Sequence, residues 1–108
     1  MPVITPPVDE NGNISFNLDE GLIIPLREVD ASGTEIDVSG LSRYFTIANG
    51  RLRMEVGNDP NNVKGKRLVL TPTQLREVQG LSVFSYTDED GVVPIVLWEG
   101  KIYERNLA

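Results

Sequence analysis

Short apolar runs alternate with turn signals along almost the whole chain, and this alternation limits the fold more than any other feature. From Ile14 onward, apolar-rich runs of roughly four to eight residues are separated by Gly, Pro, Asn and Asp at intervals of about 8 to 12 residues. Runs of this length suit β-strands, and most are too short for helices. The pattern predicts an all-β domain, folded as a sandwich or a barrel.

The apolar runs also give the positions of the expected strands. Within the run 22–29, Pro25 cannot donate a hydrogen bond to a neighbouring strand, so we expect this strand at a sheet edge or interrupted by a bulge. The polar stretch 57–66 is expected to be a loop. The other strands are predicted at residues 14–18, 35–38, 67–70, 81–86, 92–98 and 101–105, with turns at 30–33, 88–91 and 99–100.

A hairpin in the middle of the chain is the clearest local signal. Asn49-Gly50 favours a two-residue type I′ turn, because both residues tolerate positive φ. After this turn, charged and apolar residues alternate over 51–56. Such alternation gives a strand one buried face and one wet face.

One short helix is expected near residues 72–79. Thr71 can cap it, Pro72 suits its first position, and Gln74 completes a capping box. Gly80 can end it.

Residues 1–13 are interpreted as an extended N-terminal arm, and residues 14–108 as the β-sandwich domain. The arm is apolar enough to dock on a neighbouring molecule, although a frayed terminus is an equally good interpretation. The proline-containing edge strand offers a second route to association, by strand addition. The candidate partner-binding residues are Val3, Ile4, Val8, Ile24 and Pro25.

Charge and missing residue types exclude several classes of function. The 108-residue chain has the length of one domain and carries a net charge of −6, with a pI near 4.5. Neither nucleic acid nor an anionic membrane surface is an expected partner, since both attract Lys and Arg. The chain has no cysteine and no histidine, which removes disulfides, thiolate metal sites and the commonest proton-transfer group. We therefore expect no enzymatic activity and no cofactor.

The sequence contains no recognisable signal for membrane insertion or for secretion. No apolar run approaches the ~20 residues of a membrane-spanning helix. The N-terminal sequence lacks the basic and apolar regions of a secretory signal.

Acidic loops and aromatic residues are the remaining candidates for ligand sites. Calcium prefers closely spaced carboxylate and carbonyl oxygens, which the acidic stretches offer, but none has the spacing of an EF-hand loop. Asp or Asn close before Gly is ordinary turn chemistry, so we interpret these stretches as turns. An exposed Trp98 beside Tyr86 or Tyr103 would form a platform for stacking on a sugar; burial in the core is the alternative.

The order of the motifs resembles a known family. After FNLDEGLIIPLREV come Asp-x-x-Gly, Asp-Val-Ser-Gly, the middle hairpin, Leu-Thr-Pro-Thr-Gln-Leu, a Tyr-containing strand, Asp-Glu-Asp-Gly and a strand that ends in Glu-Gly. Over about residues 16–105 this order resembles small immunoglobulin-like domains of tailed bacteriophages, such as the N-terminal domain of baseplate upper proteins. Val38 replaces the usual Leu, and Pro25 and Pro94 interrupt strands. The matching positions are Asp30, Gly33, Asp37, Gly40, Leu70, Thr71, Gln74, Tyr86, Asp88, Asp90, Gly91 and Gly100.

This resemblance implies an immunoglobulin-like antiparallel β-sandwich that carries no catalytic residues. It also implies a structural or accessory protein of a phage virion, made in the bacterial cytoplasm and placed in the tail, baseplate or neck or on the capsid as a decoration. The expected partners are other virion proteins and further copies of the chain in a homo-oligomer. A carbohydrate-binding module for attachment to the host surface is the alternative function.

Overall fold

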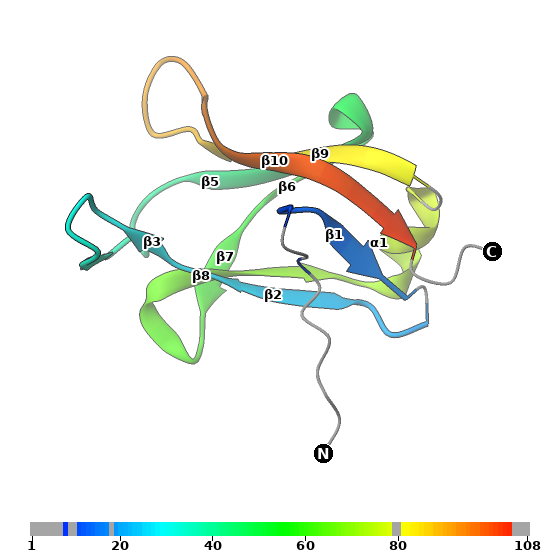
Figure 1. The fold of residues 1–108 in the computed structure, drawn as a ribbon, viewed down its shortest axis with the longest axis horizontal. Coiled ribbons are helices and arrows are strands. Elements are labelled where there is room, and N and C mark those ends of the chain that lie inside the picture. Colours follow the sequence, from blue (N-terminus) through cyan, green and yellow to red (C-terminus); the bar gives the residue numbers. More distant parts are fainter. Residues whose placement is uncertain (1–7, 9–10, 18, 79–80, 105–108) are drawn as a thin grey trace.

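Over the residues that the structure describes, the chain folds as an all-β sandwich with one short α-helix (Figure 1). The computed structural model describes residues 8, 11–17, 19–78 and 81–104. A five-stranded sheet of order β1-β10-β9-β5-β6 lies over a three-stranded sheet of order β2-β8-β7, and β3 pairs with β4. The elements are β1 (Ile14–Phe16), β2 (Leu22–Leu26), β3 (Glu28–Val29), β4 (Glu35–Ile36), β5 (Arg43–Ile47), η1 (Ala48–Gly50), β6 (Leu52–Glu55), β7 (Gly57–Asp59), β8 (Asn62–Leu70), α1 (Pro72–Glu77), β9 (Leu81–Asp88) and β10 (Ile95–Glu104).

The two sheets enclose one apolar core, because alternate side chains of each strand point to the facing sheet. At its centre, Phe45 stacks on Phe84 with ring centroids 5.3 Å apart. Trp98 meets Phe84 edge to face, with centroids 4.7 Å apart. Hydrophobic side chains with no exposed surface come from strands of both sheets, from the helix and from a connecting loop: Ile14, Phe16, Val38, Ile47, Leu68, Leu75 and Ile102.

One strand pair departs from the expected antiparallel arrangement. β1 runs parallel to the end of β10, with Ile14 opposite Ile102 and Phe16 opposite Glu104. The other pairs formed by the described strands are antiparallel. The first described strand, β1, therefore forms one edge of the five-stranded sheet, beside the last described strand, β10.

The middle hairpin is present, but its turn is not the expected type I′. β5 pairs with β6 up to Ile47 opposite Leu52, so residues 48–51 connect the strands. They contain the 3₁₀ turn η1, in which Ala48 and Gly50 have φ of 56° and 100°. The register that places Ile47 in the core ends the ladder there, and this leaves too many residues for a two-residue turn.

The stretch 57–66 is a hairpin and not the expected polar loop. β7 pairs with β8, and Asp59 lies opposite Asn62 next to the turn. Oδ1 of Asp59 accepts a hydrogen bond of 2.8 Å from the N–H of Asn61. Polar side chains thus stabilise the turn, while the backbone groups pair as a ladder that polarity alone does not exclude.

β10 continues through residues 99–100, so the turn expected there is wrong. Residues 92–94, expected in a strand, belong to the loop before β10. A Cβ atom on Gly100 would lie 2.9 Å from Oδ1 of Asn13 and 3.0 Å from the carbonyl oxygen of Gly12. Close approach of the N-terminal turn, and not a bend in the strand, explains this glycine.

The segment 22–29 forms two strands that separate at Arg27. Pro25 lies within β2, which is an edge strand of the three-stranded sheet. The expectation of an edge position is confirmed, because a missing N–H is tolerated where the strand has only one neighbour.

The predicted helix is also confirmed. Oγ1 of Thr71 accepts a hydrogen bond from the N–H of Gln74 at 3.2 Å, and Oε1 of Gln74 accepts one from the N–H of Thr71 at 2.9 Å. This capping box starts α1 between β8 and β9, and Leu75 anchors it in the core. Within the described residues, no helix has the length and apolar content to span a membrane.

Candidate interface on the hairpin between β9 and β10

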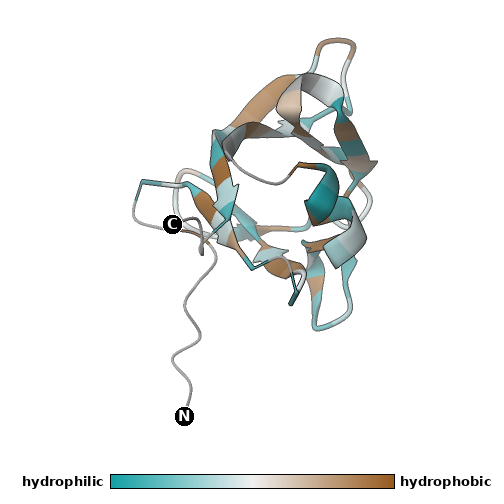
Figure 2. Cartoon of the chain, turned by 90° about the vertical axis from the view of Figure 1, so that its right-hand side faces the viewer, coloured by the Kyte–Doolittle hydropathy of each residue, from teal (hydrophilic) through white to brown (hydrophobic). Residues whose placement is uncertain are grey.

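A run of exposed apolar side chains joins β9 to β10. Every residue from 91 to 97 is exposed, and five of the seven are large aliphatics whose exposure falls from complete at Val92 to 43% at Leu97. The loop extends beyond the sheets in Figure 1, and Figure 2 shows its hydrophobic colour at the top of the molecule. Residues 91–97 are called the apolar strip below. Contiguous exposed apolar surface of this kind is typical of an interaction site.

A β-bulge separates the apolar strip from the core-packed part of β10. Val96 lies opposite Thr87 and Trp98 lies opposite Tyr86, so Leu97 is the extra residue. Before the bulge the side chains are exposed, and after it Trp98 packs against the core. Bulges re-aim side chains in this way, and here the bulge keeps the aliphatic residues outside the sandwich.

A buried cation, Arg43 on β5, fixes the base of the hairpin. Its Nε and Nη2 donate to the carboxylate of Glu28 at 2.7 and 3.0 Å, and its Nη1 donates to Asp90 at 2.7 Å. Asp88 lies 3.3 Å from the same Nη1. Hydrogen bonding to Glu28, with help from Asp90 and Asp88, raises the pKa of Arg43. One guanidinium thus joins β3, β5 and the end of β9 through paired, charge-assisted contacts.

Backbone contacts reinforce this base. The N–H of Ser42 donates to Oδ1 of Asp90 at 2.6 Å, and the N–H of Glu89 donates to the carbonyl of Ser42 at 3.1 Å. Arg53 pairs with Glu89, which also accepts from Oγ1 of Thr87 at 2.8 Å. The Ser42 contact lowers the pKa of Asp90, and the Arg53 contact lowers that of Glu89. Both carboxylates are therefore ionised at neutral pH, and the strip begins on a rigid base.

The polar groups of this cluster satisfy one another. The hydroxyl of Tyr86 donates to Glu28 at 3.4 Å, and burial raises the pKa of Tyr86. Among the described residues, every buried side-chain nitrogen or oxygen has a hydrogen-bond partner. The cluster is therefore suited to holding the hairpin in place.

In the same part of β10, one edge has no neighbour among the described strands. β1 pairs only with Ile102–Glu104, and the turn before β1 meets β10 through the bond from Nε1 of Trp98 to the carbonyl of Gly12 at 2.9 Å. No described strand lies beside Ile95–Leu97 on the side away from β9. Apolar side chains thus coincide with a backbone edge that no described strand covers, and such an edge favours association.

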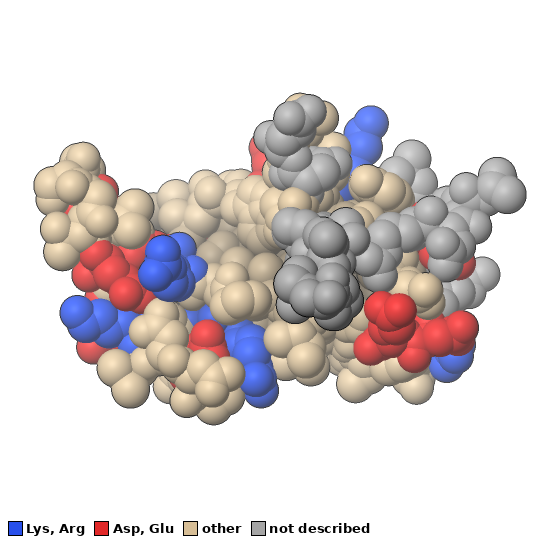
Figure 3. Space-filling model, turned by 60° about the horizontal axis from the view of Figure 1, so that its bottom comes forward, with Lys and Arg blue, Asp and Glu red and all other residues tan. Residues whose placement is uncertain are grey.

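A second exposed apolar surface lies on the outer face of the three-stranded sheet. Ile23 on β2 is directly opposite Val69 on β8, and both are exposed. Pro25 is exposed on the same strand. On the face turned forward in Figure 3, acidic and basic side chains are interspersed around apolar and neutral ones, and the visible described residues form no continuous basic field.

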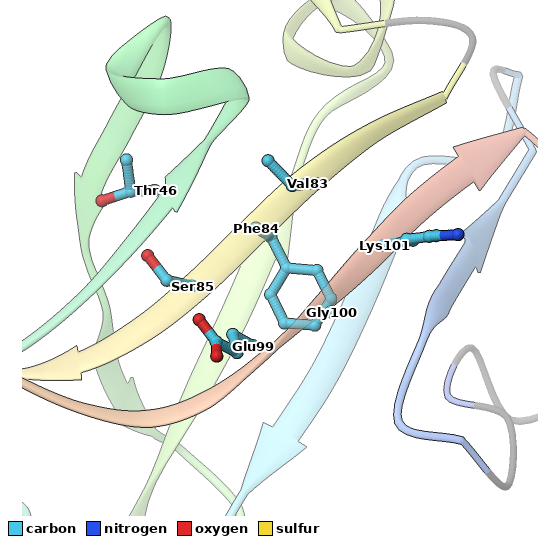
Figure 4. A pocket seen from close by; sticks show the side chains of 7 residues that line it. All are labelled: Thr46, Val83, Phe84, Ser85, Glu99, Gly100 and Lys101. Carbon is cyan, nitrogen blue, oxygen red and sulfur yellow. The ribbon is translucent and has the colours of Figure 1, made fainter.

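A shallow open hollow of about 460 Å³ lies on the outer face of the five-stranded sheet (Figure 4). Thr46, Ser85 and Glu99 line it in one row across three strands, beside Val83 and Lys101. Figure 4 shows the Glu99 and Lys101 side chains well apart. This open hollow, with few polar groups that converge on one point, is a weaker candidate for a functional site than the apolar strip.

The candidate partner-binding residues have different positions in the structure. Val3 and Ile4 lie outside the described residues. Val8 is half-buried against the core and forms a bridge with Ile14, so it docks on its own protomer. Ile24 is 5% exposed, which corrects its assignment: its side chain fills the core and is unavailable to a partner. Pro25 is exposed at the edge, and its role in binding stays a prediction.

The aromatic platform for a sugar is not present at the expected place. Tyr86 is 3% exposed and belongs to the core. Trp98 and Tyr103 are half-buried, and the Trp98 indole is held by its contacts to Phe84 and Gly12. Core packing explains the rings of Tyr86 and Trp98, so the carbohydrate-binding alternative loses the pair that suggested it.

The acidic stretches at Asp30 and Asp37 form turns, as expected. Oδ1 of Asp30 accepts from the N–H groups of Ser32 at 2.9 Å and Thr34 at 3.0 Å, and Gly33 has a φ of 85°. Oδ1 of Asp37 likewise accepts from Ser39. Each carboxylate is used by its own backbone, as in Asx-turns. No cluster of acidic side chains with metal-site geometry occurs within the described residues.

The solved structures that are similar to this chain include one that covers most of it. The N-terminal domain of phage TP901-1 ORF48 covers 85% of this chain and 81% of its own, with 14% sequence identity and a TM-score of 0.45. No protein-family model and no curated protein matches the sequence. Identity and TM-score this low leave the assignment of function to the residues of this chain.

Proposed function

We propose that this chain is a non-enzymatic structural or accessory protein of a bacteriophage particle. It joins copies of itself and a neighbouring virion protein through exposed apolar surface. The observation that carries this proposal is the apolar strip on its Arg43-braced hairpin, a projecting surface that is costly to leave in water. The phage assignment is supported by the ordered motifs from Asp30 to Gly100.

We infer further that the sandwich is of the immunoglobulin type. The sheet order β10-β9-β5-β6 corresponds to the order G-F-C-C′, and β2-β8-β7 corresponds to B-E-D. The proposed absence of catalysis is supported by a sequence without histidine or cysteine. The virion is the location that a structural role of this kind requires.

Magnitudes suggest how such a protein would assemble. Completing the burial of five partly exposed aliphatic side chains contributes about 1 kcal/mol each, or roughly 5 kcal/mol in total. Association costs at least about 4 kcal/mol in lost translational and rotational freedom, so one such contact is weak. Many equivalent contacts in a closed ring or lattice make the assembly firm.

The deciding experiment is peptide mass spectrometry on purified particles from the source culture, with the copy number taken relative to the major capsid protein. We expect the protein in a fixed ratio: about a dozen copies for a ring in the tail or neck, or hundreds for a capsid decoration. Absence from clean particles would contradict the virion role. Val93→Asp with Ile95→Asp should lower the copy number, whereas the exposed control Val63→Asp should not.

A further inference from the structure

Uncharged sequence is distributed unevenly over this acidic chain. Five runs of eight or more residues carry no charged side chain, namely residues 1–8, 11–18, 68–75, 78–87 and 91–98. Three of them supply core residues from β1, β8 with α1, and β9. The run 91–98 contains the exposed apolar strip. The run 1–8 contains Val3, Ile4 and Val8, of which the structure describes only Val8.

We propose that residues 1–7 of one copy pack on the apolar strip of a second copy. This inference rests on the proposed function and deepens it, because it names the segment through which copies join. The contact is head-to-tail: each protomer offers one arm and one strip, so it can receive one neighbour and engage another.

The distribution of charge favours residues 1–7 as the segment that binds the apolar strip. The protomers carry −6 each and repel one another, and the strip starts beside Asp88, Glu89 and Asp90. Among the described residues, the basic partners of that acidic group are Arg43 and Arg53. A segment without acidic residues therefore approaches the strip with the least like-charge repulsion, and residues 1–7 contain none.

Reach favours the arm of another copy over the arm of the same copy. Val8 bridges Ile14, which lies opposite Ile102 on β10. Ile95 precedes Ile102 by seven residues on this strand, a separation of about 23 Å. Seven fully extended residues span at most about 25 Å. Within one protomer the arm would have to be fully extended to reach Ile95, in the middle of the strip, whereas the arm of a neighbour has no such limit.

The composition of the arm suits docking. The sequence has prolines at positions 2, 6 and 7, and each fixes its own φ, so less conformational entropy is lost when the segment binds. Val3 and Ile4 supply aliphatic side chains for an aliphatic surface. The edge of Ile95–Leu97, which no described strand covers, lies alongside to receive an extended segment.

The test measures molecular mass by sedimentation velocity over a wide range of protein concentration. The full chain should associate as concentration rises. Deletion of residues 1–7, or Val93→Asp with Ile95→Asp, should each return the mass to that of the protomer, near 11.9 kDa. Val63→Asp, a control at a valine that is 83% exposed outside the strip, should associate like the full chain.

Mixing the two defective proteins separates this contact from others. The deletion variant keeps a strip without an arm, and the double variant keeps an arm without a strip. Together they can form one contact and no more, so an equimolar mixture should give a 1:1 complex although neither protein associates alone.

Three outcomes would overturn the inference: a full chain that stays monomeric, a deletion variant that keeps the association, or a mixture without the 1:1 complex. None of these outcomes contradicts docking on another virion protein. That function fails only if the protein is absent from particles.

Discussion

At the scale of single residues, Arg43 connects more of the molecule than any other side chain described above. It is 4% exposed and contacts Glu28, Asp88 and Asp90, which come from two parts of the chain far apart in sequence. Removal of either partner of a buried ion pair is destabilising, because the charge that is left loses the interaction that offsets its desolvation. The position of the apolar strip therefore depends on one ion-pair cluster.

Replacing Arg43 should cost considerable stability. We expect Arg43→Met to lower the free energy of unfolding by about 3 kcal/mol, since the carboxylates lose their shared partner. Arg43→Lys should fall between this variant and the wild type, because it keeps the charge but not the two-pronged geometry. Urea denaturation followed by Trp98 fluorescence measures both.

A matched surface control is Arg76→Met. Arg76 pairs with Asp19 at 3.8 Å in an exposed position, so its loss should change the free energy of unfolding by less than about 0.5 kcal/mol. Equal effects of Arg43→Met and Arg76→Met would show that the cluster does not brace the hairpin.

The stability of the fold should depend on pH chiefly through carboxylates that become protonated at acidic pH. The pKa values of Asp30, Asp37, Glu89 and Asp90 are lowered in the folded chain by hydrogen bonds, chiefly from Ser32, Ser39, Arg53 and Ser42 respectively. A lowered folded pKa stabilises the protein above the unfolded values, near 3.8 to 4.5. This stabilisation is lost as the pH falls through the folded values.

The thermal midpoint should therefore change little between pH 8 and about 5, because the chain has no histidine, and should fall below about pH 4.5. Thermal denaturation followed by circular dichroism at stepped pH measures this. Asp90→Asn should make the acid decline shallower. A marked loss of stability between pH 8 and 6 would contradict the assignment.

At the scale of elements, the β9–β10 hairpin combines a rigid base with an exposed tip. The bulge at Leu97 lets one strand serve two purposes: Trp98 packs into the core, while Val96 stays outside. The helix α1 shows the opposite case, an element whose only described interior contribution is Leu75. Its start depends on local capping.

The capping box predicts a modest, local effect of mutation. Thr71→Ala should lower the free energy of unfolding by about 1 kcal/mol, because the N–H of Gln74 loses its side-chain acceptor. Thr73→Ala, on the exposed face of the same helix, should be neutral or slightly stabilising. Chemical denaturation of both variants provides the comparison, and equal losses would mean that capping does not start this helix.

At the scale of the whole molecule, net charge and exposed apolar surface act against each other. A charge of −6 opposes contact between copies at neutral pH, whereas the strip and the Ile23–Val69 face favour it. Which effect dominates should depend on pH and on the surrounding partners.

Light scattering should therefore rise to a maximum near the pI of 4.5, where the repulsion between copies vanishes. Val93→Ser with Ile95→Thr leaves the charge unchanged and should lower that maximum. Val63→Ser, outside the strip, should not. Equal scattering by all three proteins would show that the strip contributes nothing to association.

The sequence by itself determined the all-β class, the middle hairpin, the edge position of Pro25, the Asp30 turn and the helix with its capping box. These features depend on local physics: alternation of side chains, the φ preference of glycine, the missing N–H of proline and the reach of a side chain to its own backbone. Local chemistry of this kind can be read without knowledge of distant contacts.

Tertiary structure decided the rest. The polar residues of 57–66 predicted a loop, although this stretch forms the ladder of β7 and β8. Gly100 predicted a turn, although it lies within a strand and makes room for the turn at Gly12 and Asn13. The candidate interface differs from the predicted one for the same reason. The side chain of Ile24 is buried, whereas the apolar strip, which was predicted as a strand, is exposed. An apolar run without alternation fits a strand buried on both faces as well as a strand that projects from the fold. Only the long-range pairing of β10 with β9 and β1 places residues 91–97 beyond the core, because burial depends on which segments the folded chain brings together.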